Sequence, residues 1–562
     1  MAERPVPGAL AALDLATIED VGAREALRAL SNLVEELVAE VQALRAELAQ
    51  VKDENARLKG GQGRPQIRPG KSAGGSTDYS SEQERRMAPK TWQKRGKQDR
   101  LRIDRTERVV VDPSMLPADA ELKGYETVVV QDLALRTDTI AFEVAVWYSP
   151  SERRSYRARR PAGYEGTFGP HLRTLVLTLA YGGGMSERKI LELVQSTGIV
   201  ISAGTVSSLL TGGRTAFEAE AREVLKAGLA STPYQHLDDT STRVDGEGQY
   251  CQIVCNPLYT AYQTTPKKDR RTIIEVLRGG LSGGRPRTYR FDREADRHLV
   301  FLGLSAAARA KLTAIPREQT LDEATLAQLL DGPARGLGPK QQEQVREALA
   351  LAAYLADPDW PVVRTLVCDD APQFRAITEE LALCWIHEGR HFKKLTPYLP
   401  QHQAALADVL TQFWDYYREL LAYREQPTNE ERARLDAGFD ALFGTTTSYQ
   451  ALDERLALTR DKKPELLLVL EHPELPLHNN PAELGARQRV RKRDVSFGPR
   501  SPAGSAAWDT FMTLAATTRK LGLDFAAYLH DRFTQAGQIP PLADLITARA
   551  PQLALSPSDA TA

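Results

Sequence analysis

Apolar residues recur at strict heptad spacing near the start of the chain. Positions d hold Leu30, Leu37, Leu44, Val51 and Leu58, and positions a hold Val34, Val41, Leu48 and the polar Asn55. A repeat of this length predicts a coiled coil, and one polar residue among β-branched residues at position a favours a parallel dimer. A single amphipathic helix packed on its own domain is the alternative. We expect residues 1–59 to form a helical segment that joins two copies of the chain.

A polar, basic stretch separates this segment from the next pattern. Residues 60–108 are rich in Gly, Pro, Ser and basic side chains, a composition typical of a flexible linker. Arg95 and Lys97 within it are suited to neutralise phosphates, although a plain solvated linker fits the composition equally well. Residues 109–170 then alternate between apolar and polar in several places, including 127–131, which predicts a small β-rich module.

The pattern changes to helical spacing at residue 171. Helices are predicted for residues 172–181, for residues 186–195 and from Ser202 onward. Two short helices around a Gly-containing turn are typical of helix-turn-helix modules, although plain helical bundles show the same pattern. Ser202 is expected to cap the second helix, which would then present Thr205, Ser207 and Ser208 to DNA. Residues 171–230 are therefore a candidate DNA-binding region.

From residue 235 the chain alternates as β-strands do, and two strands deliver aspartates. In the first, Asp238 and Asp239 point to opposite faces, so only one of them can face a given site. In the second, an apolar run over residues 366–368 leads directly into Asp369 and Asp370. A carboxylate at the end of a buried strand needs a compensating cation, whereas an Asx-type turn before a helix needs none. This stretch alone leaves both explanations open.

Helix-rich stretches interrupt the strands. Residues 280–360 combine Gly-, Pro- and Arg-rich pieces with Ala-rich helices and are predicted to be an insertion, and a second helical insertion is predicted for residues 390–470. Cys251 and Cys255 lie on one face of a strand and are expected to fill the core. A further helix is predicted over residues 377–395.

This last helix contains a known metal-binding motif. His387, Glu388 and His391 match the H-E-x-x-H pattern of zinc metalloproteases. Against that function, Gly389 lies inside the predicted helix, and no convincing third ligand follows downstream. The alternative is a helix with partly buried histidines near basic residues.

Another predicted helix combines a carboxylate with many basic residues. Asn480 is expected at its N-cap, followed by Pro481 at the first position and Glu483 at the third. At helical spacing Glu483, Arg487 and Arg491 share one face. The other basic residues close by are Arg489, Lys492 and Arg493. Glu483 is thus either a cap or a metal ligand on a helix suited to a phosphate backbone.

The overall composition narrows the classes of function. The 562 residues carry a net charge of −1, so any affinity for nucleic acid must come from local basic patches. The four cysteines give no disulfide framework and no C-x-x-C pair, which excludes a zinc ribbon of the usual spacing. No apolar run is long enough to span a membrane, so we expect a soluble cytoplasmic protein without a membrane partner.

Three fragments in this order resemble the bacterial DDE transposases of the insertion-sequence-sixty-six type. They are HLDDTSTRV, LVCDDAPQF followed by CWIHEGRHF, and LPLHNNPAELGARQRVRKRDVSF. The similarity spans most of residues 170–535. The chain departs from the family in two ways, because residues 109–170 lack the usual cysteine-rich module and the insertion at residues 280–360 is larger than expected.

The resemblance implies a fold and a set of site residues. The fold is α/β, an RNase H-like mixed sheet with a large helical insertion over residues 231–535, preceded by the helix-turn-helix region and the coiled coil and followed by a tail at residues 536–562. Asp238, Asp369 and Glu483 would be the catalytic acids and would bind two Mg²⁺ or Mn²⁺ ions. The residues expected to support these acids are Asp239, Asp370, His387 and Asn480.

The resemblance also implies an activity and its partners. The protein would be a DNA transposase that cleaves mobile-element ends and joins their 3′-ends to target DNA, working as a homodimer at the bacterial nucleoid. The expected DNA contacts are Thr205, Ser207, Ser208, Arg487, Arg489, Arg491, Lys492, Arg493, Arg95 and Lys97. The alternative is a catalytically inactive or domesticated DNA-binding or assembly protein with the same fold. A zinc metalloprotease using His387 and His391 is the third possibility.

Overall fold

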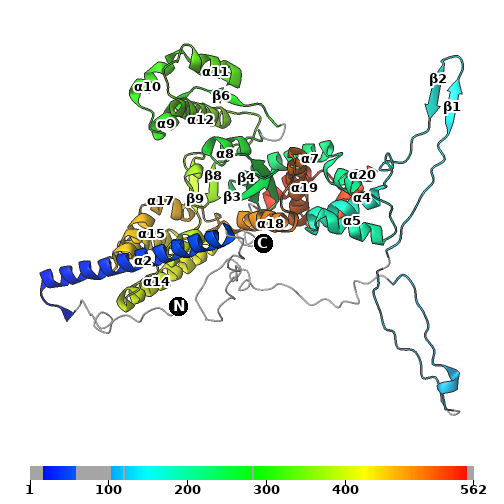
Figure 1. Cartoon of the computed structure of the whole chain (residues 1–562), viewed down its shortest axis with the longest axis horizontal. Helices are drawn as coiled ribbons and strands as arrows, with labels where there is room; N and C mark the ends of the chain where they lie inside the picture. The colour runs from blue at the N-terminus through cyan, green and yellow to red at the C-terminus, as the bar shows by residue number, and fades with distance from the viewer. Residues whose placement is uncertain (1–16, 59–102, 118–119, 134, 281–283, 554–562) are drawn as a thin grey trace.

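A mixed β-sheet of five strands forms the centre of the molecule (Figure 1). The computed structural model describes residues 17–58, 103–117, 120–133, 135–280 and 284–553. The strands are β3 (Tyr234–Val244), β4 (Glu247–Asn256), β5 (Tyr259–Thr265), β8 (Thr365–Cys368) and β9 (Glu380–Leu383). Their order is β5-β4-β3-β8-β9, with β3, β4 and β5 antiparallel and with β8 and β9 parallel to β3. The predicted α/β class is confirmed.

The strands at the centre of the sheet are buried on both faces. All four residues of β8 are buried, as expected of a parallel strand that lies between two others. On β4, Cys251 and Cys255 are fully buried and form no disulfide, so they fill the core as predicted. The apolar runs of this sequence are therefore long enough to specify a sheet interior.

Helix α19 (Pro502–Lys520) closes the outer edge of the sheet along β5. Three backbone N–H groups of this edge strand donate to side chains spaced one helical turn apart: Thr260 to Thr517 (3.3 Å), Tyr262 to Thr513 (3.0 Å) and Thr264 to Asp509 (2.7 Å). Buried backbone donors need partners, and an uncovered edge strand invites pairing with another chain. The helix supplies the partners and removes the exposed edge.

Four α-helices lie between residue 170 and the first strand of the sheet. They are α4 (Pro170–Leu177), α5 (Glu187–Ser196), α6 (Ala203–Thr211) and α7 (Thr215–Ala230). Helices α5 and α6 correspond to the two short helices that the sequence predicts around a glycine turn, in which Gly198 has a φ of 89°. Ser202 caps α6 as predicted, because its Oγ accepts from the backbone N–H of Thr205 at 3.2 Å.

Two helical units are added to the sheet. The first contains β6 (Thr288–Arg290), α9 (Arg293–Phe301), α10 (Ala306–Ala310), β7 (Thr320–Asp322), α11 (Glu323–Asp331) and α12 (Pro339–Leu355), and it packs against α8 (Arg270–Leu277). The second contains α14 (Pro400–Glu425), α15 (Asn429–Phe443), α16 (Gln450–Arg460) and α17 (Lys463–Leu466). The second unit has its own apolar core around Trp385 and Phe413.

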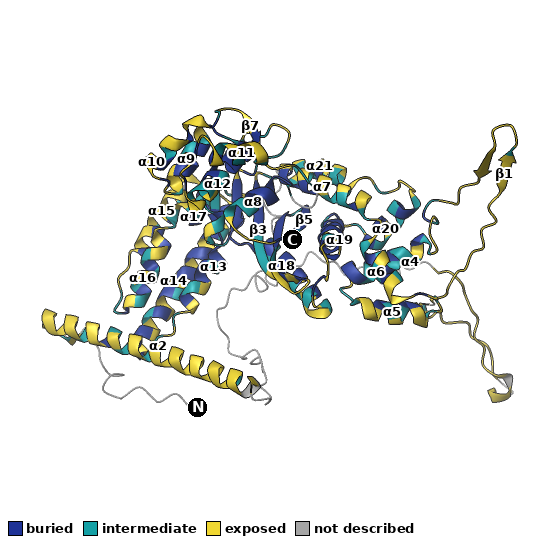
Figure 2. Cartoon of the chain, turned by 45° about the horizontal axis from the view of Figure 1, so that its top comes forward, coloured by how far each residue is buried: buried dark blue, intermediate teal, exposed yellow. Residues whose placement is uncertain are grey.

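The stretch before the helices contains less β-structure than the sequence predicts. Within the described part of residues 109–170, the strands are limited to one hairpin, β1 (Val146–Ser149) and β2 (Arg154–Arg157), and residues 127–131 form no strand. Most of this stretch is exposed (Figure 2). The predicted β-rich module is therefore wrong in extent, because alternating residues form a sheet only when a second surface buries their apolar face.

The predicted helix over residues 377–395 is also wrong at its start. Residues Glu380–Leu383 form strand β9, which pairs in parallel with β8, and helix α13 (Trp385–Lys393) begins only afterwards. A short apolar run is ambiguous between helix and strand. Here the neighbouring strand β8 decides, since it offers a complete row of backbone partners.

Helix α2 (Val21–Leu58) lies against the second helical unit (Figure 1). The carboxylate of Glu35 accepts from the backbone N–H groups of Tyr398 (2.7 Å) and Leu399 (2.8 Å) and contacts His402 Nδ1 (3.0 Å) at the start of α14. Asn32 Oδ1 accepts from the backbone N–H of Gln450 at the start of α16 (2.9 Å). Within the described residues, no helix is long and apolar enough to cross a lipid bilayer.

Candidate active site

Two parallel strands place Asp238 and Asp369 next to each other at one end of the sheet. β3 and β8 pair in a register that joins Tyr234 to Thr365 and His236 to Val367. Continuing this register by two positions brings Asp238 opposite Asp369, which directly follows β8. Both carboxylates are half-buried.

Helix α18 (Asn480–Ser496) brings Glu483 to the same place. The preceding residue, Asn479, is fully buried, and its side chain donates to the carbonyl of Leu237 (2.7 Å) and contacts His236 Nδ1 (3.0 Å). Both partners belong to β3, immediately before Asp238. The start of α18 is thereby fixed to the strand that carries the first acid.

A glycine lets α18 lie directly on the sheet. A Cβ atom on Gly485 would stand 2.8 Å from Ile253 Cγ2 on β4, closer than real Cβ atoms approach. The hydroxyl of Tyr262 on β5 donates to the carbonyl of Gly485 at 3.3 Å. This close approach and the anchored Asn479 together determine where Glu483 sits.

The predicted N-cap of this helix is off by one residue. Asn479, not Asn480, occupies the cap, and Asn480 is the first helical residue. The Asn479 side chain makes no cap hydrogen bond because it is used to contact β3. Glu483 therefore lies one position further into the helix than a capping residue would, and its carboxylate remains available for another partner.

The three acids interact electrostatically. Burial, together with the charges of Asp369 and Glu483, raises the pKa of Asp238 to about 7, although the hydrogen bond from the Asp239 backbone opposes the shift. Burial also raises the pKa of Asp369, although His387 opposes the shift. Neither Asp238 nor Asp369 has an ion pair with any residue in the described ranges. Negative charge is thus concentrated on these two aspartates without a direct salt bridge, although His387 and Lys268 attract Asp369 from a distance.

Glu483 differs from the two aspartates because a cation touches it. Arg390 Nη2 donates to Glu483 Oε2 at 3.2 Å, and Arg390 Nη1 donates to His387 Nε2 at 3.0 Å. His387 Nδ1 lies 3.6 Å from Glu483 Oε1. Burial lowers the pKa of His387, which Glu483 opposes. Arg390 comes from α13 and is half exposed, so it can move away from the site.

Asp239 points away from Asp238, as the strand alternation predicts. Its carboxylate accepts from Lys268 Nζ (3.3 Å) and from the side-chain amide of Gln373 (3.1 Å). Gln373 belongs to a short 3₁₀ helix, Pro372–Phe374, that begins two residues after Asp370. Asp239 therefore connects β3 to the turn after β8 and helps to hold Asp369 in place.

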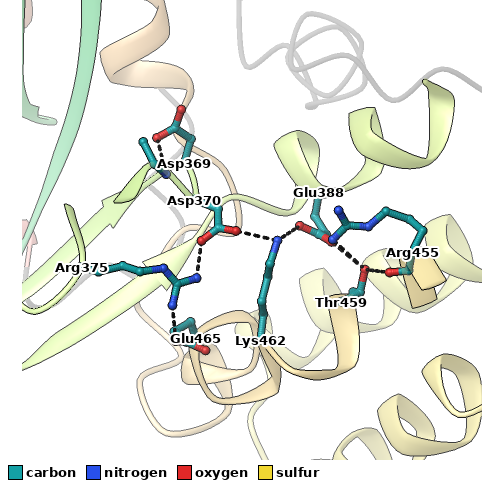
Figure 3. Close-up of polar contacts among 9 residues, drawn as sticks. Asp369, Asp370, Arg375, Glu388, Arg455, Thr459, Lys462 and Glu465 are labelled. Carbon is teal, nitrogen blue, oxygen red and sulfur yellow. Dashed lines mark hydrogen bonds and ion pairs between the residues drawn. The ribbon is translucent and has the colours of Figure 1, made fainter. Parts of the chain in front are cut away.

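Asp370 takes part in a chain of ion pairs that runs into the second helical unit (Figure 3). It pairs with Arg375 and with Lys462 Nζ (2.7 Å), and Lys462 continues to Glu388 Oε2 (3.1 Å). These cations outweigh the effect of burial and lower the pKa of Asp370. Figure 3 shows Asp369 standing apart from this chain.

The same chain of ion pairs accounts for the central residue of the metalloprotease motif. Glu388 is buried, pairs with Arg455 and Lys462, and accepts from Thr459 Oγ1 at 2.6 Å. Its helix lies tightly against Trp414, which a Cβ on Gly389 would approach to 2.7 Å. Glu388 is therefore committed to packing the helix rather than to acting as a general base.

The basic residues of α18 divide into a buried and an exposed set. Arg489 is 1% exposed and pairs with Asp509 Oδ1 at 3.1 Å. Lys492 is 7% exposed, and its Nζ donates to the carbonyl of Ala180 at 2.6 Å. Predicting these two as DNA contacts is wrong, because their charged groups are used inside the protein.

The remaining predicted DNA contacts have different environments. Arg487 and Arg491 are exposed on α18, while Arg493 is half-buried and donates to the carbonyl of Ser241 on β3. On α6, Ser208 is exposed and Thr205 and Ser207 are half-buried. Arg95 and Lys97 lie outside the described residues.

Three residues that shape this candidate site are not found by the sequence analysis. Asn479 could have been found from the Asn-Asn pair, of which only one residue can be the cap. Arg390 on α13 and Lys462 in the turn before α17 give no separate signal, since each is one basic residue among many. Their partners Glu483 and Asp370 lie far away in the sequence, so only the fold brings them together.

Two comparisons with known proteins bear on the family of this chain. The family model described as Transposase IS66 family matches residues 165–286 and 340–507, which include all three acids. The match omits residues 287–339, most of the first helical unit. The uncharacterized protein y4jO of Sinorhizobium fredii (strain NBRC 101917 / NGR234) is 33% identical over 332 residues, 58% of this chain and all of that protein. The chain belongs to the IS66 family of transposases.

Proposed function

We propose that the protein is a DDE transposase that cleaves DNA at mobile-element ends and joins the new 3′-ends to target DNA. The observation that carries this proposal is the convergence of Asp238, Asp369 and Glu483 from β3, β8 and α18 at one end of the sheet. Two acids on adjacent strands and a third on a helix against them also support an RNase H-like domain. Asp238 and Asp369 are half-buried, have raised pKa values and have no ion pair among the described residues, and such perturbed acids are typical of functional sites.

The donor atoms fit Mg²⁺ or Mn²⁺. Carboxylate oxygens are the ligands that these ions prefer. The three acids repel one another, and a bound cation would relieve this repulsion. When bound, two such ions activate a water or a 3′-hydroxyl and stabilise the leaving oxygen. Asp238, Asp369 and Glu483 would hold them, with Asp239 and Asp370 fixing the β8 end through Gln373 and Lys462.

DNA would bind along the exposed side of α18. Arg487 and Arg491 lie one and two turns beyond Glu483 on the same side of the helix. Arg390 is half exposed beside Glu483 and would contact a phosphate once it leaves that carboxylate. The α6 residues Thr205, Ser207 and Ser208 would add contacts further from the cleaved bond. A DNA substrate would place the protein at the bacterial nucleoid in the cytoplasm.

A homodimer through α2 would complete the assembly. The helix docks on its own chain through Arg28, Asn32 and Glu35, which occupy heptad positions b and f. The apolar a and d positions other than the half-buried Val34 remain exposed, including Leu37 at 51% and Leu44 at 57%. The docking therefore leaves the apolar stripe uncovered, and a second copy of the same stripe in parallel fits it.

The test uses purified full-length protein with DNA substrates made from the sequences that flank its gene, searched first for a pair of inverted repeats. We expect nicking or strand joining that requires Mg²⁺ or Mn²⁺. Asp369→Asn and Glu483→Gln should each lose at least about 10³-fold in rate while still binding DNA, because they remove a metal ligand. Asp408→Asn, an exposed carboxylate on α14, is the matched control and should cleave normally.

Two results would contradict the proposal. Full activity of both Asp369→Asn and Glu483→Gln would mean that the acids are not the metal ligands. DNA binding with a steep salt dependence but no metal-dependent cleavage by the wild type would instead favour a DNA-binding or assembly protein with the same fold.

A further inference from the structure

Three metal-ligating side chains of different kinds meet beside the acid triad. The ligand atoms of Cys384, His387 and Glu483 all lie within 4.8 Å of one another. Cys384 is the N-cap of α13, His387 lies three residues further along, and Glu483 comes from α18. The set contains neither His391 nor the aspartates Asp238 and Asp369, so it shares only His387 with the metalloprotease motif and only Glu483 with the triad.

The backbone around this cluster is rigidly held. The backbone N–H of Trp385 donates to the carbonyl of Leu477 (2.9 Å), and its indole N–H donates to the carbonyl of Leu466 (2.9 Å). The backbone N–H of Asn479 donates to Cys384 Sγ (3.3 Å). These bonds join the first turn of α13 to the segment before α18, so the two ligand-bearing elements cannot separate easily.

One donor atom in the cluster lacks a partner. His387 Nδ1 is buried and accepts or donates no hydrogen bond, since Glu483 Oε1 is too far away at 3.6 Å. Buried polar atoms are nearly always bonded, so an unpaired ring nitrogen that faces a carboxylate and a sulfur needs an explanation. A cation between the three would satisfy it.

The ligand distances suit a small tetrahedral ion. Zinc–ligand bonds of about 2.0–2.3 Å place neighbouring tetrahedral ligands about 3.3–3.8 Å apart. Atoms within 4.8 Å of one another reach this spacing through small side-chain rotations. Sulfur, imidazole and one carboxylate are ligands that Zn²⁺ takes readily, whereas Mg²⁺ takes oxygen. We propose that Cys384, His387 and Glu483 bind Zn²⁺ at a site that shares Glu483 with the acid triad.

Arg390 competes with this cation. It donates to His387 Nε2 and to Glu483 Oε2 and so occupies both ligands from the solvent side. A metal on Nδ1 leaves the proton on Nε2, which then can no longer accept from Arg390. Arg390 and Zn²⁺ therefore exclude each other at His387. Binding of the ion releases this half-exposed arginine and fixes the orientation of Glu483.

The thiol of Cys384 must lose its proton when the ion binds. Burial opposes this loss and raises the pKa of the thiol to about 12, while backbone N–H groups of His387 and Asn479 favour the thiolate. A bound cation neutralises the negative charge of the thiolate and so lowers the pKa that burial raises. Zinc binding should therefore be accompanied by proton release.

The test is a titration of chelator-treated full-length protein with Co²⁺, a spectroscopic substitute for Zn²⁺. We expect a sulfur-to-cobalt charge-transfer band that excess Zn²⁺ abolishes. Cys384→Ser should remove the band, and His387→Gln should weaken binding at least about tenfold while keeping the thiol. Cys251→Ser, an equally buried cysteine on β4 outside the cluster, is the matched control and should keep the band. Arg390→Gln should bind Co²⁺ more tightly.

The outcomes separate this proposal from the catalytic one. Absence of the band in the wild type, or unchanged Co²⁺ binding in His387→Gln, would overturn the zinc site without touching DNA cleavage. Asp369→Asn should lose Mg²⁺-dependent cleavage and keep the cobalt band, because Asp369 is not in the ligand set. Circular dichroism of each variant confirms that a lost band reflects a lost ligand rather than unfolding.

Discussion

Two groups of buried acids meet at the same end of the sheet and differ in their counter-charges. The open acid cluster consists of Asp238, Asp369 and Glu483, and its two aspartates have no ion pair with the described residues. The paired acid cluster consists of Asp370 and Glu388, each of which contacts Lys462 and an arginine. Each cluster takes one acid from the two residues that follow β8, and the carboxylates of both clusters are buried or half-buried.

Adjacent residues of the chain thus have opposite properties. Burial raises the pKa of Asp369, whereas the cations around Asp370 overcome burial and lower its pKa. The two side chains leave an extended backbone in opposite directions, so each meets a different neighbourhood. The role of an acid in this protein is therefore not defined by its type and burial. It depends on whether the fold places a cation next to the carboxylate.

The largest expected effect is on the open cluster. Asp238→Asn should abolish cleavage and also stabilise the metal-free protein, because it removes a carboxylate that the fold disfavours in its charged form. The pKa of about 7 in the folded protein lies above the ordinary value of 3.8 for an aspartate, so the wild type loses stability as the pH rises from 4 to 7. In EDTA, we expect the variant to melt at the same temperature as the wild type at pH 4 and a few degrees higher than the wild type at pH 8. The difference at pH 8 corresponds to about 1–2 kcal/mol in the free energy of unfolding.

Melting curves of both proteins at these two pH values provide the measurement. An equal melting temperature at pH 8 would mean that Asp238 has a counter-charge in the metal-free protein, and the contrast between the clusters would disappear.

The paired cluster should respond in the opposite direction. Glu388→Gln leaves Arg455 and Lys462 without their buried partner, and loss of one member of such a pair costs about 3–5 kcal/mol. Urea unfolding should show this loss, while the cleavage rate per folded molecule stays near that of the wild type. A large loss of activity with unchanged stability would instead restore Glu388 as a chemical group.

A smaller effect, on DNA affinity, is expected from the cations of α18, where the exposed Arg491 contrasts with the buried and paired Arg489. Arg491→Gln should lower DNA affinity several-fold and reduce the slope of log K against log salt by about 0.9, as one phosphate contact would. Arg335→Gln in the first helical unit removes the same charge and should leave the slope unchanged. Arg489→Met should keep the slope and lose stability, since it leaves Asp509 buried and unpaired.

The smallest effect concerns Glu35, a buried acid outside both clusters. Hydrogen bonds from His402, Leu399 and Tyr398 outweigh burial and lower the pKa of Glu35 below 4.5, so docking of α2 is strongest above that pH and weakens in acid. Glu35→Gln should cost about 1–2 kcal/mol of docking, visible as faster proteolysis of α2 at neutral pH. Glu36→Gln, exposed on the same helix, should be cut as slowly as the wild type.

Local pattern marks Asp369 and Glu483 only as candidates, since an apolar strand leads into the first and the second opens a helix. The family resemblance, not the pattern, names them together with Asp238 as the catalytic acids, and neither describes their surroundings. The burial of Arg489 was not predictable, since α18 has no clear apolar stripe and the partner Asp509 lies on the next helix. Likewise the sequence predicts a helix where β9 lies, because only the pairing with β8 distinguishes four residues of strand from one turn of helix.

Helix α18 also fixes a distance. Its two ends are tied to different parts of the protein, through Asn479 to β3 and through Lys492 to the carbonyls of Ala180 and Met185 before α5. The nine positions from Glu483 to Lys492 span about 13 Å at 1.5 Å per residue. One inserted residue would add about 1.5 Å and turn the later side chains by about 100°, so one of the two attachments would be lost. The separation between the acids and the upstream helices can therefore change only in whole helical turns.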